Sequence, residues 1–351
     1  EREVGVGAIV LAPVSTFISR GIIMRSRIIL SRVPFRLPLG GGSTDLPSYY
    51  EKYGGFIFAT TINLYMDVLI KEPIVDDYIH MQYMKYEFES SIENIKHTIG
   101  REAIRMNGIT NKILVSFTAD TPSGTGLGSS GACSVALLKG LSRFKGRELS
   151  NTEAAEQSFR LTQNLGLPDG KQDPYACALG GFVVLDIQKN GTVVVRRPAI
   201  SPETARMFVR NTLLFYTGIR RNSKPLLTTQ NTRQAMELKH RIKDIGKKVH
   251  ASFCAGDLDA FGRLLDEHWL LKKSMSSGMS SDWLNEIYAA AKKAGALGGK
   301  IMGAGGGGYF MFYCPTPVIR SAVRDALRRI NLREVRYAID TKGARTKVLD
   351  L

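Results

Sequence analysis

Hydrophobic and polar positions alternate along the first half of the chain with the two periods that distinguish strands from helices. The short period of strands covers three segments, residues 27–35, 54–72 and 113–120. The second of these is long enough to predict a pair of strands. Helical spacing follows over residues 134–144 and 151–166, and Asn151 and Thr152 are side chains that favour the start of the second helix.

The pattern changes after Pro198. Before it, Asn190 and Gly191 lie between two β-branched runs and predict a hairpin over residues 180–198. Beyond it, long helical stretches alternate with short apolar strands. The strands are predicted over residues 211–218, 307–314 and 334–340, and the helices from about 223 to 271, over 282–294 and over 318–330. This change predicts two α+β domains, residues 24–200 and 201–351. Residues 1–23 precede Met24 and are expected to be a disordered extension outside both domains.

Composition narrows the class of protein. Of 351 residues, 44% are hydrophobic and 23% are charged, as in an ordinary globular chain, and no apolar run is long enough to cross a membrane. The N-terminal apolar run follows two acids and one Arg, so we do not expect a secretory signal. Four widely spaced cysteines without a C-x-x-C pair favour reduced thiols and a cytoplasmic location. The five histidines form no cluster that predicts structural zinc.

The net charge of +16 leaves nucleic acid, small anions or a well-solvated surface as explanations. The basic residues are scattered at spacings that suit exposed helix faces, as in KHRIKDIGKK. No basic stretch carries the interleaved aromatic residues of an RNA-binding strand. We therefore predict that the chain binds neither nucleic acid nor membrane.

A glycine-rich stretch between an apolar strand and a helix supplies the first sign of chemistry. It reads PSGTGLGSSGA from Pro122 to Ala132, and a helix N-terminus behind bare backbone attracts phosphate. It matches neither the P-loop, which needs Lys before Ser, nor the dinucleotide pattern G-x-G-x-x-G. A tightly packed turn explains it as well as a phosphate loop does. Two further glycine-dense stretches, at residues 40–42 and 303–308, favour function, because glycine is entropically costly filler.

Together the three stretches resemble a known family. VPFRLPLGGGSTDLP, PSGTGLGSSGA and KIMGAGGGGYF occur in the order of the three motifs of the GHMP small-molecule kinases, and the similarity runs from about Arg27 to the C-terminus. GKQDPYACALGGF, YTGIRRNSKPLL and LLDEHWLLKK resemble the D-glycero-D-manno-heptose 7-phosphate kinase branch, with fucokinase nearby. The resemblance implies an N-terminal domain like ribosomal protein S5 domain 2 and a ferredoxin-like C-terminal domain.

The resemblance also implies roles for single residues. ATP would be bound by Pro122, Ser123, Gly124, Thr125, Gly126, Leu127, Gly128, Ser129 and Ser130, and Ser130 would also hold Mg²⁺. Helix capping is an equally good explanation for the two serines. Asp173 matches the family's catalytic base and Arg36 the cation beside it. Asp169 lies in Leu-Pro-Asp-Gly, a turn sequence that explains it without function.

The acceptor is expected to be a sugar or sugar phosphate. Its predicted binding residues are Gly41, Gly42, Asp45, Lys171, Arg221, Gly305 and Gly306. Lys272 and Lys273 suit either a sugar phosphate or a solvated helix face. Two positions depart from the family: Leu161 stands where many relatives have a Mg²⁺-binding Glu, and Pro174 where close relatives have Gln. Glu156, Gln163, or Ser130 with the phosphates would then serve Mg²⁺.

The sequence therefore predicts an ATP- and Mg²⁺-dependent kinase, a monomer or homodimer, that phosphorylates the anomeric hydroxyl of a heptose 7-phosphate or related sugar. Two alternatives stay open: a kinase for an unphosphorylated hexose or fucose, and a non-catalytic sugar and nucleotide sensor on the same fold.

Overall fold

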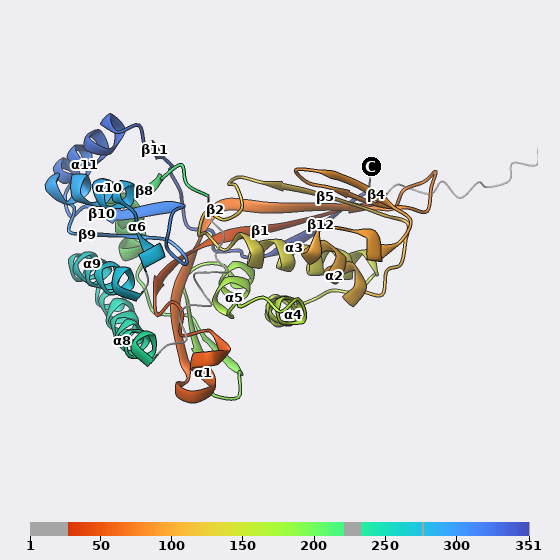
Figure 1. The fold of residues 1–351 in the computed structure, drawn as a ribbon, viewed down its shortest axis with the longest axis horizontal. Coiled ribbons are helices and arrows are strands. Elements are labelled where there is room, and N and C mark those ends of the chain that lie inside the picture. Colours follow the sequence, from red (N-terminus) through yellow and green to blue (C-terminus); the bar gives the residue numbers. More distant parts are fainter. Residues whose placement is uncertain (1–26, 221–232, 276, 351) are drawn as a thin grey trace, which may run out of the picture.

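Two β-sheets organise the molecule (Figure 1). The structure is a computed structural model, and it describes residues 27–220, 233–275 and 277–350. The larger sheet has eight strands in the order β12-β1-β2-β5-β3-β4, with β6 beside β2 and β7 beside β6. Its strands are β1 (Arg27–Gly40), β2 (Gly55–Lys71), β3 (Ile79–Gln82), β4 (Tyr86–Glu89), β5 (Ile113–Ala119), β6 (Val183–Ile187), β7 (Val193–Arg196) and β12 (Arg345–Asp350). The hairpin predicted around Asn190 and Gly191 is confirmed, because β6 and β7 pair antiparallel.

Strand β2 corrects the prediction of a strand pair over residues 54–72. It is one continuous strand of 17 residues that pairs with β1 from Phe58 to Ile70. Its first eight residues are all buried, whereas the remainder alternates. The change of pattern therefore marks where one face of the sheet loses its cover, and no turn interrupts the strand.

Helices cover one face of the larger sheet. They are α2 (Thr98–Met106), α3 (Ser129–Phe144), α4 (Asn151–Asn164) and α5 (Gln172–Leu179), whereas α1 (Pro47–Tyr53) connects β1 to β2. Helix α3 packs on both β1 and β2, and α4 and α5 pack against each other. The predicted start of α4 is displaced by one residue: its N-cap is Ser150, which forms a capping box with Glu153. Ser150 thus provides the N-cap that was expected of Asn151 or Thr152.

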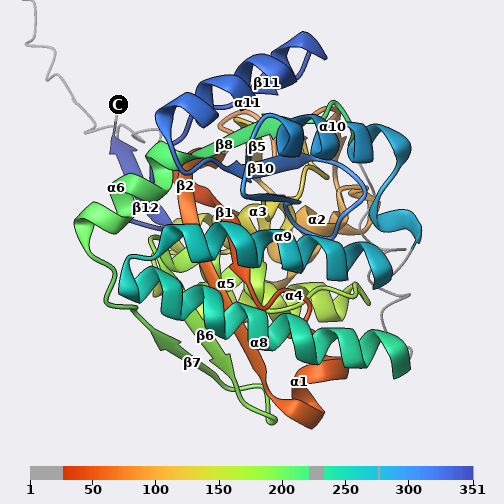
Figure 2. The ribbon, with the colours of Figure 1, turned by 90° about the vertical axis from the view of Figure 1, so that its left-hand side faces the viewer.

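The smaller sheet has the order β11-β8-β10-β9 and lies between two pairs of helices (Figure 2). Leu213 and Phe215 of β8 face α10 and α11, whereas Leu214 between them belongs to the core shared with α8 and α9. This alternation is what a strand needs when both faces of its sheet are covered. The elements are α6 (Pro202–Asn211), β8 (Thr212–Tyr216), α8 (Arg233–Ala255), α9 (Leu258–Met275), α10 (Asp282–Lys293), β9 (Gly298–Ile301), β10 (Tyr309–Tyr313), α11 (Pro317–Arg329) and β11 (Arg333–Glu334), with short 3₁₀ helices at Ile92–Asn94 and Ser277–Met279. From β8 to β11 the strands follow the ferredoxin-like β-α-β-β-α-β order, with the three helices α8, α9 and α10 in the place of the first helix.

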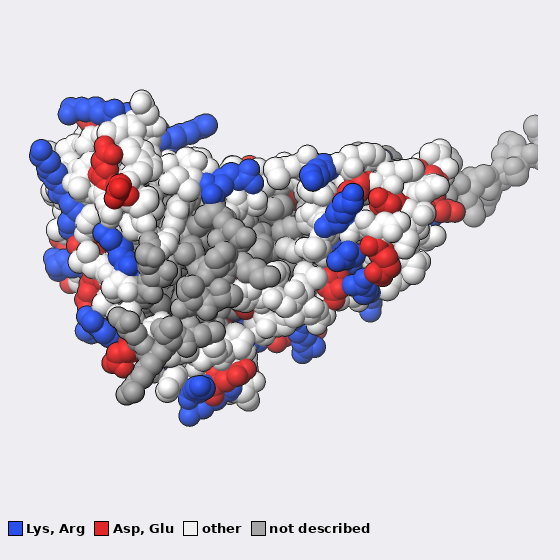
Figure 3. All heavy atoms as spheres, viewed as in Figure 1, with Lys and Arg blue, Asp and Glu red and all other residues white. Residues whose placement is uncertain are grey.

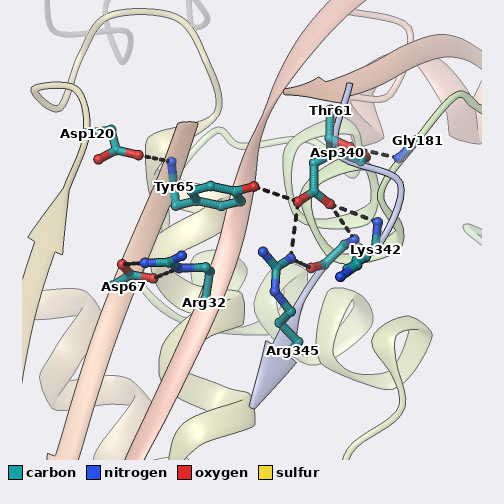
Figure 4. Close-up of polar contacts among 10 residues, drawn as sticks. Arg32, Thr61, Tyr65, Asp67, Asp120, Gly181, Asp340, Lys342 and Arg345 are labelled. Carbon is teal, nitrogen blue, oxygen red and sulfur yellow. Dashed lines mark hydrogen bonds and ion pairs between the residues drawn. The ribbon is translucent and has the colours of Figure 1, made fainter. Parts of the chain in front are cut away.

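The end of the chain corrects a second strand prediction. Of residues 334–340 only Glu334 belongs to a strand of the smaller sheet, and the last strand is β12, which pairs with β1. The segment between them crosses from one sheet to the other. Asp340 anchors it by accepting hydrogen bonds from Tyr65 Oη at 2.9 Å, from the backbone N–H groups of Lys342 and Gly343, and from Arg345 (Figure 4). The boundary near residue 200 stays a prediction, and the C-terminal strand lies in the larger sheet.

The helices and the surface charge relate to the prediction that the chain binds neither membrane nor nucleic acid. No helix in the described ranges combines the length and the apolar character that a bilayer span requires. On the face drawn in Figure 3, Lys and Arg lie dispersed among Asp and Glu rather than gathered in one patch.

Candidate active site

A cavity of about 900 Å³ brings the glycine-rich stretch together with residues from both halves of the chain. One wall comes from β1, α3, α5 and the loops around them. The opposite wall comes from α9, β9 and the loop after β9. A space of this size and mixed polarity suits a small-molecule ligand.

The glycine-rich loop, residues 122–130, runs from β5 into α3 along this cavity. Gly124, Gly126 and Gly128 have φ angles of 77°, 84° and 81°, a region that side chains with a Cβ avoid. Ser129 and Ser130 open the 16-residue helix α3 and line the cavity. Unpaired N–H groups at such an N-terminus, together with the helix dipole, favour bound phosphate.

The predicted ATP-binding residues fall into two groups. Seven of them line the cavity: Pro122, Ser123, Gly124, Gly126, Gly128, Ser129 and Ser130. Thr125 and Leu127 are buried behind the loop and shape it, since Thr125 Oγ1 donates to Pro122 O and Leu127 O accepts from Arg36 N.

The C-terminal glycine loop, residues 303–308, braces the glycine-rich loop from the other domain. Tyr309 N donates to Thr125 O at 3.2 Å. A Cβ on Gly308 would lie 2.0 Å from the same oxygen, so no larger residue fits this contact. The two loops, about 180 residues apart in sequence, thus meet at the site.

Arg36 and Asp173 are joined by an ion pair in the cavity. The Arg36 Nε and Nη2 atoms both donate to Asp173 Oδ1, at 2.9 and 2.6 Å. Arg36 Nη1 donates to Gly126 O at 2.5 Å. A single buried guanidinium from β1 therefore fixes the carboxylate at the start of α5 relative to the glycine-rich loop. Gln172 adds a hydrogen bond from Nε2 to Asp173 Oδ1 at 3.1 Å.

Two more carboxylates lie on the same wall. Asp45 is buried and accepts a hydrogen bond from Gln172 N at 2.9 Å, and its burial raises the pKa of the carboxyl. Asp169 also lines the cavity, and burial, with smaller effects of Asp173 and Asp45, raises its pKa to about 6. The sequence explained Asp169 as a turn residue. A hint to its position was its spacing of four residues from Asp173.

The opposite wall is basic. His268, Lys272 and Lys300 line the cavity, and all are buried. Helical spacing puts His268 and Lys272 on the same face of α9, against β9, which carries Lys300. Arg220 lies nearer the glycine-rich loop and donates to Ser123 O and Ser123 Oγ at 3.3 and 3.2 Å. The sequence indicated only Lys272 as a possible phosphate-binding residue of this wall, because tertiary packing is what brings Lys300 next to His268 and Lys272.

Some predicted substrate residues lie elsewhere. Gly41, Gly305 and Gly306 do not line the cavity, although their neighbours Gly42, Gly303 and Ala304 do. Lys171 is only 2% exposed and points away from the cavity into an ion pair with Glu156, at 2.7 Å. Arg221 lies outside the described residues. Lys273 donates to Asn285 Oδ1 at 2.6 Å and does not line the cavity either.

The possible Mg²⁺ ligands are correspondingly few. Glu156 is engaged by Lys171 and Tyr175, and Gln163 donates to Asp169 O, so neither lines the cavity. The described residues contain no group of three His, Cys, Asp or Glu placed to hold a metal. Of the residues expected to serve Mg²⁺, only Ser130 lines the cavity, and its hydroxyl is a suitable oxygen ligand for an ion that keeps several waters.

Comparisons with known proteins now decide the family. Residues 89–181 match the GHMP kinases N terminal domain and residues 249–332 match GHMP kinases C terminal. The chain belongs to the GHMP kinase family. The expected kinase class and the expected fold are thereby confirmed.

Two curated GHMP relatives and one solved structure extend along most of the chain. The D-glycero-alpha-D-manno-heptose 7-phosphate kinase of Campylobacter jejuni is 31% identical over 86% of this chain and 94% of its own length. The L-fucokinase/L-fucose-1-P guanylyltransferase of Bacteroides fragilis is 25% identical over 86% of this chain and 36% of that longer protein. The crystal structure of a D-glycero-D-manno-heptose 1-phosphate kinase from Bacteroides thetaiotaomicron superposes with a TM-score of 0.75 at 26% identity, covering 91% of this chain and 98% of that chain.

Proposed function

We propose that the protein is an ATP-dependent sugar kinase that phosphorylates the anomeric hydroxyl of a heptose 7-phosphate or a related sugar. The observation that carries this proposal is the Arg36–Asp173 pair, hydrogen-bonded to the glycine-rich loop inside a cavity with one acidic and one basic wall. Such an arrangement suits phosphoryl transfer, in which the protein mainly positions groups and stabilises charge.

Each residue has a defined task in this proposal. Asp173 accepts the proton of the attacking hydroxyl. Arg36 holds that carboxylate in place and supplies a fixed positive charge beside the moving phosphoryl group. The N–H groups of residues 123–130 bind the ATP phosphates. Bound Mg²⁺ would neutralise phosphate charge, with Ser130 among its ligands. Asp45 and Gly42 would bind sugar hydroxyls from the same wall as Asp173.

The acceptor is assigned from the relatives and from the charge of the site. The heptose kinase relative covers most of the chain, and the basic wall suits an acceptor that already carries phosphate. The fucokinase relative supports an unphosphorylated hexose or fucose as the second candidate. A non-catalytic sensor is disfavoured, because it has no need of a paired Arg36 and Asp173. The domain limits, the cytoplasmic location and the monomeric or homodimeric state remain predictions.

A sugar panel tests this function. Wild-type protein is incubated with ATP, Mg²⁺ and matched heptoses, hexoses and fucose, with and without terminal phosphate, and ADP release is measured. We expect turnover of a heptose 7-phosphate with the new phosphate at the anomeric carbon, which ³¹P NMR detects. Turnover of free fucose or hexose alone would establish the second candidate. Sugar binding with no ADP release from any member of the panel would establish the sensor.

A further inference from the structure

The three basic residues on the C-terminal wall, His268, Lys272 and Lys300, form a compact group that the mechanism above does not use. We call it the basic cluster. Lys300 Nζ lies 3.3 Å from His268 Nδ1, and Lys272 Nζ donates to Gly303 O at the start of the C-terminal glycine loop. All three side chains line the same cavity as Asp45 and Asp173, on elements from the C-terminal half of the chain.

Burial makes this cluster costly in the absence of an anion. Lys300 and His268 are each 2% exposed and Lys272 is 8% exposed. In the part of the chain that the structure describes, no carboxylate forms an ion pair with Lys300 or His268. Burial first, and then the neighbouring cations, hold the pKa values of Lys300 and His268 well below their usual range. Buried charges are normally paired with an opposite charge, so Lys300 and His268, which contact each other and no carboxylate in the described residues, suit a bound anion.

The glycine-rich loop makes the ATP phosphates a poor candidate for that partner. ATP phosphates are provided for by the N-terminus of α3 and by Arg220, which hydrogen-bonds to Ser123. The basic cluster belongs to α9 and β9 of the other wall. It is nevertheless within electrostatic reach of Arg36, whose charge contributes to lowering the pKa of Lys300. Its partner would therefore lie in the same cavity as Arg36 but outside the glycine-rich loop.

We propose that the basic cluster binds the phosphate monoester of the acceptor sugar and makes the enzyme selective for phosphorylated acceptors. This proposal rests on the proposed function and states where in the cavity the phosphate of the acceptor would bind. A phosphate monoester offers three acceptor oxygens and carries close to two negative charges, and it matches the clustered N–H donors of two Lys and one His. The sugar hydroxyls then face the carboxylates of Asp45 and Asp169 on the other wall.

Lys300→Met tests the proposal, because Met keeps the length of the side chain and removes its charge. The readout is kcat/KM for matched sugars with and without terminal phosphate. Loss of a charge-assisted hydrogen bond should lower kcat/KM for the phosphorylated sugar about ten- to hundredfold and change that for the free sugar far less. The dissociation constant of a non-hydrolysable ATP analogue should be unchanged. Lys293→Met, at an exposed position at the end of α10, is the matched control and should leave kcat/KM unchanged for both the phosphorylated and the free sugar.

Lys272→Met is the second variant and should narrow the same preference. Each variant is first checked by thermal melting, and phosphorylated and free sugars are also compared by calorimetry, so that binding is measured when turnover is absent. An equal fall in kcat/KM for the phosphorylated and the free sugar would overturn the proposal. Weaker binding of the ATP analogue with an unchanged preference for the phosphorylated sugar would also overturn it, because the cluster would then bind the nucleotide. If wild-type protein binds sugar phosphates through Lys300 but releases no ADP, the proposed function fails and the phosphate site stands.

Discussion

Asp169→Asn should make the protein more stable at neutral pH, although it removes a residue of the candidate site. Burial, and then the charges of Asp173 and Asp45, raise the pKa of this carboxyl from 3.8 to about 6 in the folded protein. A raised pKa means that the folded state binds the proton more tightly than the unfolded state does. The stabilising effect of that proton is fully present below about pH 4 and is lost as the pH rises through about 6.

The size of the effect follows from the pKa shift. A shift of this size corresponds to about 3 kcal/mol between the two protonation states. Because the carboxyl is partly open to the cavity, we expect the Asn variant to gain about 1–3 kcal/mol in free energy of unfolding above pH 7. Asn keeps the volume of the side chain and carries no charge. The gain should shrink steadily toward pH 4, where the wild-type carboxyl is protonated in the folded state and about half protonated in the unfolded state.

Urea unfolding of wild type and variant at a series of pH values between 4 and 7.5 measures this difference. Asp325→Asn, at an exposed position on α11, is the control and should show no such trend. A difference that stays constant over the whole pH range would show that the change acts through packing or hydrogen bonding. A less stable Asn variant at pH 7.5 would refute the reasoning outright, because the buried charge would then be favourable.

Three further substitutions test the other parts of the site. Asp173→Asn should lower kcat at least about 10²- to 10⁴-fold while leaving the affinity for an ATP analogue nearly unchanged, and turnover at the wild-type rate would remove Asp173 from its role as base. Gly126→Val should weaken binding of the same analogue severely, since φ is 84° and a side chain would enter the phosphate cradle; unchanged affinity by calorimetry would contradict that role. Glu156→Ala should reduce the free energy of unfolding by about 1–3 kcal/mol, because it leaves the Lys171 ammonium buried without its carboxylate. Urea unfolding at pH 7 measures this change, and unchanged stability would contradict a structural role for Lys171.

The contact between Arg36 and Asp173 shows what the sequence could predict. Arg36 and Asp173 are 137 positions apart, yet motif resemblance placed both, and the structure joins them by two hydrogen bonds. The glycine-rich loop was predicted for the same reason, since its alternating glycines meet a strict backbone requirement that is visible in one short stretch.

The residues that were missed depend on tertiary packing. Lys300 and His268 are 32 positions apart and become neighbours only because α9 packs on β9. Lys171 was expected to bind substrate, but Glu156 on the adjacent helix takes its ammonium. Strand β2 was divided in two because its pattern changes where the cover of the sheet changes, and a periodicity argument cannot separate that change from a turn.

The two walls of the cavity hold charges that cannot satisfy each other. On one wall burial raises the pKa values of Asp45 and Asp169, and on the other it lowers those of Lys300 and His268, so each group is shifted toward its neutral form. Direct ion pairs across the cavity would have reversed both sets of shifts, and none joins these groups within the described residues. A ligand with hydroxyl donors at one end and a phosphate at the other would satisfy both walls at once. Under the proposed function these groups would provide selectivity, because a free sugar would leave the basic wall without an anion and an inorganic phosphate would leave the acidic wall without donors.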